Sequence, residues 1–206
     1  MPEAPSTDVA HLLPLVTGRL VVRPLASRDL DALLAYRGDA LVCRYLPFVP
    51  QSRELLLDRV AGSWTATAFA LDGDMLILGV ARPTDDQVVG DMMLRLVSRE
   101  HRCAELGYVF SPSVSGQGYA TEASAAILGL AFDALDLHRV VARLDARNLP
   151  SARLAVRLGM RQEAHLVRNE FFKGEWSDEL DFAMLAEEWP TSAAHEHHTG
   201  TQAPMR

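Results

Sequence analysis

The apolar residues of the chain fall into two patterns, short runs rich in strand-forming residues and longer stretches with helical spacing. Three of the short runs follow one another, and polar turns at 83–86 and 98–101 separate them, which predicts an antiparallel meander. Four further runs predict strands elsewhere in the chain. The predicted strands are 19–23, 75–81, 88–97, 103–110, 139–144, 161–172 and 179–185.

Helical spacing of apolar residues predicts four helices between these strands. Ser27 and Ser52 are candidate N-caps of the first two. The longest predicted helix spans about 119–135, and a short helix at 148–158 ends before Gly159, a residue suited to a C-terminal cap. The mixture predicts an α/β (α+β) fold in one domain, since no repeat or linker interrupts it.

The two ends of the chain differ from the middle. Residues 1–16 hold three prolines and scattered apolar residues, and we expect a loose lead-in there. Residues 190–206 hold almost no large apolar side chain, so burial cannot offset the ordering entropy and we expect a disordered tail. This leaves residues 17–189 as the folded domain. Three histidines lie in the tail, namely His195, His197 and His198. They lack a Cys or acidic partner set, so we favour solvated side chains over a metal site and expect no metal.

Composition and charge narrow the range of functions. In 206 residues, 20 basic and 27 acidic side chains give a formal net charge of −7. This balance argues against nucleic-acid binding and suits a cationic substrate such as an amine. We see no apolar run near the roughly 20 residues that span a bilayer, and no signal-peptide pattern. Cys43 and Cys103 are too few for a disulfide scaffold, so we expect a reducing compartment and a cytoplasmic protein. From the charge balance and the lack of a spanning segment, we expect neither nucleic-acid nor membrane partners.

The segment 105–123 carries the strongest chemical signal. A predicted strand ends at Phe110, a short loop contains Gly116 and Gly118, and a helix follows at once. Backbone amides and a helix N-terminus then lie together, an arrangement that favours an anion such as a pyrophosphate. Glycines let the backbone approach such a ligand closely. The same spacing also fits an ordinary tight strand-to-helix loop, and these residues alone leave both interpretations open.

Several segments together resemble the GNAT superfamily of N-acetyltransferases and, within it, the RimJ/RimL branch. The resemblance covers about residues 15–189 and includes the order of the predicted elements. Its motifs are Thr17-Gly18-Arg19-Leu20 with Arg23-Pro24-Leu25, Gln117-Gly118-Tyr119-Ala120-Thr121-Glu122-Ala123, Asn148-x-x-Ser151, Arg157-Leu158-Gly159-Met160, and Phe172-Lys173-Gly174-Glu175-Trp176 with Asp178. The resemblance implies the GNAT fold, a mixed and mostly antiparallel sheet flanked by helices, in which the fourth and fifth strands splay apart.

The resemblance also implies a binding site for acetyl-CoA. The family's loop pattern falls on Ser115, Gly118 and Ala120, and Ser115 departs from it because the family carries a long polar side chain there. The pantetheine arm would pair with the strand 105–110, and the amide of Val109 or Phe110 would stabilise the oxyanion. The expected cofactor-binding residues are Val109, Phe110, Ser115, Gly116, Gln117, Gly118, Tyr119, Ala120, Thr121, Asn148 and Ser151.

Candidates for proton transfer follow from the same resemblance. In the family, the residue that matches Ser151 lies near the CoA sulfur. Many members use a tyrosine of the helix after the glycine loop as the acid, but no tyrosine follows Tyr119 on that helix here, so Ser151 is the candidate acid. A cap hydroxyl without a catalytic role is the alternative. An amine is mostly protonated at neutral pH and needs a base before it attacks a thioester. Glu170 lies where the RimJ/RimL branch places a base and Glu105 where other members carry one, although each also fits a solvated or salt-bridged surface glutamate.

The leading hypothesis is an acetyl-CoA-dependent N-acetyltransferase that acts in a direct ternary complex. Its acceptor would be an amine of a small molecule or of a protein N-terminus. Two alternatives stay open: a catalytically silent domain that binds CoA or an amine as a sensor or scaffold, and a transferase of a larger acyl group such as succinyl. Fold and length choose neither the acceptor nor the oligomeric state, for which a homodimer stays open.

Overall fold

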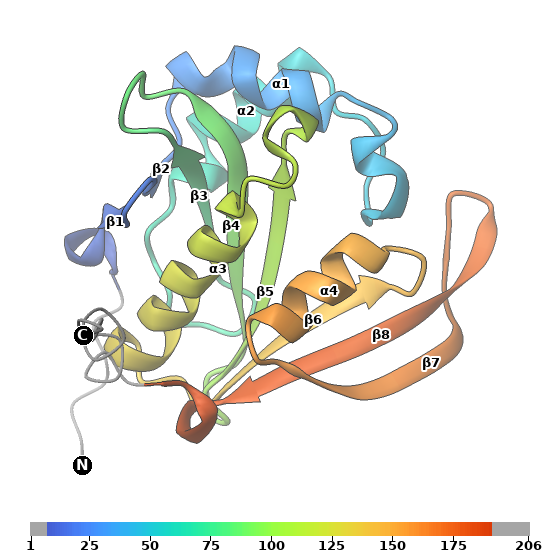
Figure 1. Cartoon of the computed structure of the whole chain (residues 1–206). Coiled ribbons are helices and arrows are strands. Elements are labelled where there is room, and N and C mark those ends of the chain that lie inside the picture. The colour runs from blue at the N-terminus through green and yellow to red at the C-terminus, as the bar shows by residue number, and fades with distance from the viewer. Residues whose placement is uncertain (1–7, 191–206) are drawn as a thin grey trace, which may run out of the picture.

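A computed structural model describes residues 8–190 as one eight-stranded mixed sheet with helices on both faces (Figure 1). The strand order is β1-β2-β3-β4-β5-β6-β8-β7, with β5 and β6 parallel and the other neighbours antiparallel. The predicted mixed sheet is therefore confirmed. The strands are β1 Leu15–Val16, β2 Val21–Pro24, β3 Met75–Ala81, β4 Val88–Ser98, β5 Cys103–Phe110, β6 Arg139–Asp145, β7 Arg161–Phe172 and β8 Glu175–Leu185. The helices are α1 Leu30–Arg37, α2 Arg53–Ala61, α3 Tyr119–Gly129 and α4 Leu149–Arg157. α3 continues as a π-helical turn over Leu130–Ala134, and a short 3-10 segment, η3, spans Val42–Tyr45.

The predicted meander is present as β3, β4 and β5. Their bounds agree with the predicted segments to within one residue at each end. The last hairpin is longer than predicted, because β8 begins at Glu175 instead of residue 179. Lys173 and Gly174 both have positive φ, so the chain reverses in a two-residue turn and the strands pair right up to it.

Part of the lead-in, which we expected outside the folded domain, pairs with the sheet and packs on the core. Leu15–Val16 pairs with β2, and Asp8 forms an isolated bridge to Ala68. The side chain of Val9 is buried in the main core. Scattered apolar residues such as Val9 therefore have a tertiary partner that local pattern could not show. The predicted tail and its histidines lie, from residue 191 on, outside the described residues.

The helices follow their local signals with one exception. Ser52 caps α2 as predicted, but α1 begins at Leu30 and not directly after Ser27. The carboxylate of Asp29 accepts a hydrogen bond from the amide of Ala26 at 2.8 Å, so Asp29 organises this helix start. Within residues 8–190 no helix is both long and apolar enough to cross a bilayer.

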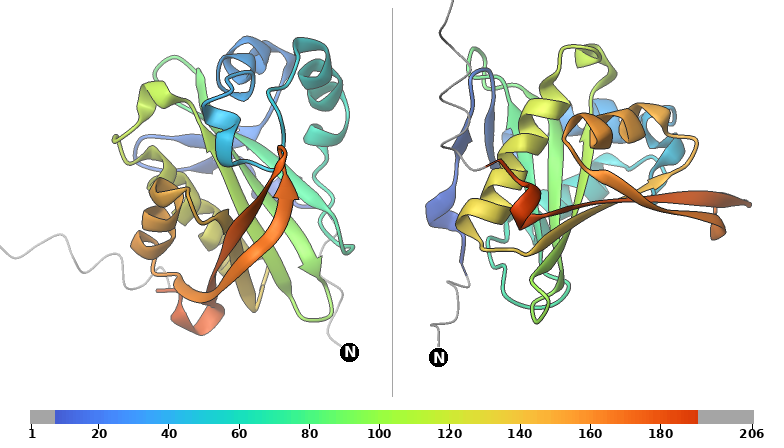
Figure 2. Two further views of the ribbon diagram at one scale, coloured as in Figure 1. Left: turned by 90° about the vertical axis from the view of Figure 1, so that its right-hand side faces the viewer. Right: turned by 60° about the horizontal axis from the view of Figure 1, so that its bottom comes forward.

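Alternate residues of the central strands face two separate cores. On β3, Leu76, Leu78 and Val80 pack with α3, whereas Ile77 and Ala81 pack with α1 and α2. One face of the sheet therefore carries α3, and the other carries α1 and α2 (Figures 1 and 2). This two-sided burial explains why β3 and β4 are apolar at nearly every position.

The strands β5 and β6 separate soon after they begin. Residues 103–105 pair with 139–141, and beyond these three pairs β5 continues along β4 while β6 continues along β8. The expected gap between these strands is confirmed, and α4 lies beside it (Figure 1). Because the backbones part, their amide groups on the gap side are placed to receive a ligand.

Candidate active site

The glycine loop between β5 and α3 borders a large cavity. Gly116 and Gly118 have φ values of +76° and +79°, conformations that residues with a Cβ rarely adopt. Gly118 directly precedes α3, so the loop and the helix N-terminus present backbone amides in one place. The cavity measures about 1020 Å³ and extends from this loop to the N-terminus of α4. This size suits a ligand as large as a nucleotide cofactor.

Six of the seven expected loop residues line this cavity, namely Ser115, Gly116, Gly118, Tyr119, Ala120 and Thr121. Gln117 does not, and its carbonyl accepts a hydrogen bond from Arg19 at 2.9 Å instead. Arg19 also pairs with Glu122 at 2.7 Å and lies over the ring of Tyr119. Arg19, which had no predicted role, therefore fixes the loop and the first turn of α3 from the direction of β2.

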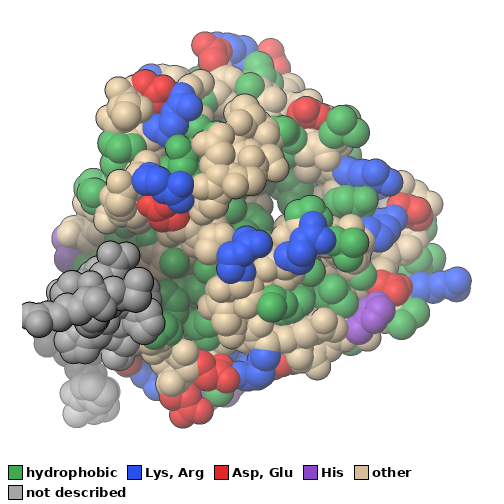
Figure 3. Space-filling model, viewed as in Figure 1, with side chains coloured by type: hydrophobic (Ala, Val, Ile, Leu, Met, Phe, Trp, Pro, Cys, Tyr) green, Lys and Arg blue, Asp and Glu red, His purple; other side chains and the backbone are tan. Residues whose placement is uncertain are grey.

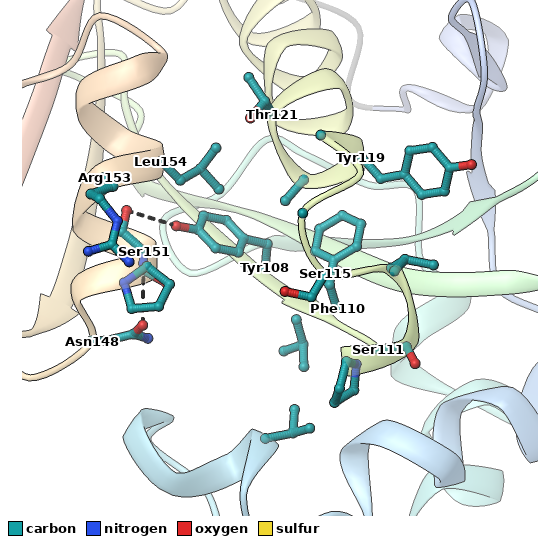
Figure 4. A pocket seen from close by; sticks show the side chains of 18 of the residues that line it. Tyr108, Phe110, Ser111, Ser115, Tyr119, Thr121, Asn148, Ser151, Arg153 and Leu154 are labelled. Carbon is teal, nitrogen blue, oxygen red and sulfur yellow. Dashed lines mark hydrogen bonds between the residues drawn. The ribbon is translucent and has the colours of Figure 1, made fainter.

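Ser151 and Asn148 meet at the N-terminus of α4 (Figure 4). The Oδ1 of Asn148 accepts a hydrogen bond from the amide of Ser151 at 3.3 Å, so Asn148 is the N-cap. Both residues line the large cavity, and Ser151 is 9% exposed. From β5, the hydroxyl of Tyr108 donates to the Ser151 carbonyl at 3.3 Å. Burial raises the pKa of Tyr108, so a second protonated hydroxyl lies beside Ser151. The sequence analysis did not name Tyr108, and the only sequence signal for it is its position on β5, two residues before Phe110.

The backbone of β5 distinguishes the two candidate oxyanion donors, both of which line the cavity. The amide of Ser111 donates to the carbonyl of Val89 at 2.9 Å and so points toward β4. Amides alternate in direction along a strand, so the amide of Val109 also points toward β4, and the amide of Phe110 points toward the gap. The geometry therefore favours Phe110 over Val109.

Arginine side chains of α4 flank the same cavity. Arg153 and Arg157 line it, and Arg157 donates to the hydroxyl of Thr121 on α3 at 3.2 Å. Figure 3 shows a hollow in this face of the molecule, with basic side chains along its rim. Guanidinium groups and loop amides together form a set of donors that suits phosphate oxygens. The residues present therefore fit a phosphate-bearing ligand such as acetyl-CoA.

A second cavity, of about 170 Å³, lies against the face of the sheet that carries α1 and α2. Leu94 and Leu106 face the α3 core, so by strand alternation their neighbours Arg95 and Glu105 face the opposite side. Tyr45 of η3 lines both cavities and so forms a wall that they share. Four carboxylates and two guanidiniums contribute to the smaller cavity, whose lining is Tyr45, Pro47, Arg95, Glu105, Arg143, Leu144, Asp145, Glu170 and Glu179.

The two predicted bases both line the smaller cavity, but their surroundings differ. The Oε2 of Glu105 accepts hydrogen bonds from Arg95 at 2.5 Å and from Arg143 at 2.9 Å. Glu105 therefore joins β4 and β6 as a salt-bridged residue. Glu170 lies on β7 opposite Ser177, and it is exposed.

A third carboxylate of this cavity, Glu179 on β8, was not predicted. It is 8% exposed, and the Nδ2 of Asn169 donates to its Oε1 at 3.1 Å. Burial, followed by the charges of Asp181 and Glu170, raises the pKa of Glu179 to about 7. A carboxyl group that titrates near neutral pH is suited to accept a proton. The alternation Glu179-Leu180-Asp181 marks one acidic strand face in the sequence, but only the tertiary structure shows that this face adjoins the gap.

One side chain connects the β7–β8 hairpin to η3 beside the cavities. The Nζ of Lys173 donates to three carbonyls, those of Cys43, Arg44 and Leu46. The hairpin tip and η3 accordingly lie next to each other (Figure 2). Since Tyr45 lies within this segment, Lys173 holds in place the wall that both cavities share.

Comparison with known proteins agrees with this geometry. The family model of the acetyltransferase (GNAT) domain matches residues 19–161. The chain is 31% identical over 178 residues to the uncharacterized N-acetyltransferase YnaD of Bacillus subtilis, covering 85% of this chain and 98% of YnaD. It is 24% identical over 122 residues to the spermidine N(1)-acetyltransferase of Escherichia coli, covering 59% of this chain and 63% of that enzyme.

Solved structures show the same relationship. An acetyltransferase of the GNAT family from Bacillus anthracis matches with a TM-score of 0.76 and 28% identity, over 85% of this chain and 99% of that one. The region matched by the family model contains the glycine loop and α4, so the larger cavity lies within it, whereas Glu170 and Glu179 of the smaller cavity lie beyond residue 161. The protein therefore belongs to the GNAT family and is an acetyltransferase.

Proposed function

We propose that the protein transfers the acetyl group of acetyl-CoA to a primary amine of a cationic acceptor within a ternary complex. The observation that carries this proposal is that two chemically different cavities, with Tyr45 as a shared wall, lie beside the gap between β5 and β6. The larger cavity offers amides and arginines that suit CoA, and the smaller offers carboxylates that suit an ammonium group. Two substrates held in adjoining cavities react without an enzyme-bound acetyl group, and their fixed orientation supplies much of the rate.

On the donor side, the glycine loop and α4 supply the binding groups. The loop amides, Arg153 and Arg157 are proposed to hold the phosphates. The amide of Phe110 faces the gap and would stabilise the oxyanion that develops on the thioester oxygen. Ser151, beside the hydroxyl of Tyr108, is the proposed proton donor to the leaving thiolate.

On the acceptor side, charge and size limit the substrate. A volume of about 170 Å³ admits the amine-bearing end of a chain and not a bulky ring system. The RimJ/RimL-like motifs support a protein N-terminal amine, and the relative named spermidine N(1)-acetyltransferase supports a polyamine. Both acceptors are cations at neutral pH. The excess of carboxylates favours the polyamine, because it carries more than one positive charge.

Release of the CoA thiol from acetyl-CoA tests the proposal, with spermidine and a short peptide with a free N-terminus as acceptors. We expect release that depends on the acceptor, faster with spermidine, and initial rates that vary with both substrates as in a ternary complex. Binding of acetyl-CoA without thiol release for either amine would identify a silent domain. Faster release from succinyl-CoA would identify a transferase of larger acyl groups.

A further inference from the structure

The strand β7 carries a bulge beside the smaller cavity. Leu166 pairs with Glu179 and Glu170 pairs with Ser177, so four steps along β7 correspond to two steps along β8. Within the bulge, Arg168 has a φ of +51°, which is uncommon for a residue with a side chain. Bulges of this kind bend a strand and redirect its side chains, and they are frequent next to active sites.

This bulge places Asn169 against Glu179. The Nδ2 of Asn169 donates to the Oε1 of Glu179 at 3.1 Å. The Oδ1 of Asp178, the neighbour of Glu179, accepts a hydrogen bond from the amide of Arg168 at 2.9 Å and fastens the bulge to β8. Glu179 is thus a buried carboxyl group held by a neutral amide, in contrast to Glu105, which two guanidiniums hold.

Charged groups face Glu179 from each neighbouring strand. They include Asp181 on β8, Glu170 on β7, Arg143 and Asp145 on β6, and Glu105 on β5. Four of these five groups are carboxylates, which disfavour a further negative charge, and burial disfavours it more strongly. An ammonium group that enters the cavity adds the positive charge that the ionised form of Glu179 lacks.

We infer that Glu179 takes the proton from the acceptor ammonium, and that Asn169 is its positioning residue. This inference rests on the proposed function. One N–H bond of the ammonium breaks, its proton moves to a carboxylate oxygen of Glu179, and the nitrogen lone pair forms the C–N bond to the acetyl carbon. As the C–S bond breaks, its electron pair stays on sulfur, and a second proton from the nitrogen passes to the thiolate through Ser151. Glu179 returns its proton to water before the next turnover.

Glu105 and Glu170, two other carboxylates of the cavity, have different tasks in this assignment. Glu105 is engaged by two guanidiniums and keeps β4, β5 and β6 in place. Glu170 is exposed, so it attracts and orients the cation without needing to accept its proton. The assignment therefore predicts different kinetic losses for two glutamates that lie in one cavity.

Steady-state kinetics with acetyl-CoA and spermidine between pH 6 and 10 test the inference. Glu179→Gln should lower kcat/KM about 10²-fold at pH 7 and remove the inflection near pH 7, because acid–base groups contribute roughly 10²–10⁴-fold. The loss should shrink near pH 10, since an amine with a pKa of about 10 then deprotonates in water. Glu170→Gln should raise KM for spermidine and keep the inflection. Glu54→Gln, on the exposed side of α2, is the matched control and should keep wild-type kinetics.

Two further variants separate catalysis from folding. Glu179→Asp keeps a carboxyl group and should retain the inflection at a reduced rate. Asn169→Ala removes a donor that stabilises the ionised carboxylate, so the inflection should move to higher pH, a change that a merely structural residue would not cause. An unchanged inflection in Glu179→Gln would overturn the inference while leaving the acetyltransferase proposal intact. Failure of the wild type to acetylate spermidine or the peptide at any pH would overturn both.

Discussion

At the level of single residues, a buried network of charges attaches α1 to the sheet. Asp91 on β4 is 1% exposed, Arg37 pairs with it at 2.5 Å, and the hydroxyl of Tyr36 donates to it at 2.8 Å. Arg37 also lies over the rings of Phe48 and Trp64. The segment that follows α1 contains η3, so this network helps to fix the wall that both cavities share.

Asp91→Ala should lower the free energy of unfolding by about 3–5 kcal/mol, because it leaves the guanidinium of Arg37 buried without its counter-charge. Urea unfolding followed by circular dichroism measures this change. Asp31→Ala removes an exposed partner of Arg53 and should leave the midpoint nearly unchanged. Similar midpoints for both variants would contradict the importance of the buried pair.

Gly118→Val should weaken acetyl-CoA binding at least tenfold, about 1.4 kcal/mol. The substitution forces a β-branched residue into a φ of +79° and places a Cβ 3.4 Å from the Nη2 of Arg19. Isothermal calorimetry gives the dissociation constant. Gly73→Val is the matched control, since Gly73 has a φ of +95° in a turn with open space around it. It should lose stability but bind acetyl-CoA normally, and unchanged binding by Gly118→Val would exclude the loop from the cofactor site.

Glu179→Gln should make the protein more stable at pH 8 than the wild type. Folding raises the pKa of Glu179 to about 7, so its contribution to stability is complete below the unfolded value of about 4.5 and is lost as the pH rises through 7. The neutral amide avoids this loss. Melting temperatures at pH 5 and pH 8 should therefore show a gap between variant and wild type that opens only at the higher pH. A gap of equal size at both values would argue against a raised pKa.

At the level of elements, the contact between the β7–β8 hairpin and η3 sets the shape of the acceptor side. Lys173→Ala removes donors to three carbonyls and should raise KM for the amine several-fold while leaving the affinity for acetyl-CoA unchanged. Lys173→Arg should restore the KM for the amine only in part, because a planar guanidinium cannot direct its donors as a compact ammonium does. Kinetics and calorimetry separate the two affinities. Loss of acetyl-CoA binding in Lys173→Ala would show that the hairpin acts on the donor side instead.

Local signals predicted most elements of this fold, and tertiary contacts account for the rest. The meander carries a strong signal in its strand-forming runs. α4 carries one in the cap at Asn148 and the turn residue Gly159. β1 is only two residues long and forms because β2 is already in place. The bulge at 167–169 depends on pairing with β8, so the sequence did not single out Asn169 or the buried Glu179. The family resemblance named Glu170 as a candidate base. Motif resemblance located the glycine loop because that site is formed by adjacent residues, whereas five strands and η3 form the acceptor cavity.

At the level of the whole molecule, the sheet consists of two parts, β1–β5 and β6–β8, that pair directly through three residue pairs. A ligand that spans the glycine loop and α4 contacts both parts. Acetyl-CoA at 100 times its dissociation constant should therefore stabilise the fold by about 2.7 kcal/mol. Thermal unfolding should show this as a rise of about 5–10 °C in Tm. The same acetyl-CoA concentration should produce a much smaller rise in Gly118→Val, and an equal rise in both proteins would place the ligand elsewhere.

The lysine that holds the hairpin against η3 is the only lysine among the 206 residues of the sequence, beside 19 arginines. Reagents selective for ε-amines therefore have a single side-chain target, and modifying it breaks the contact with three carbonyls. Coupling the protein to a dye or a sensor surface through lysine would perturb the acceptor side itself, so attachment belongs at another group.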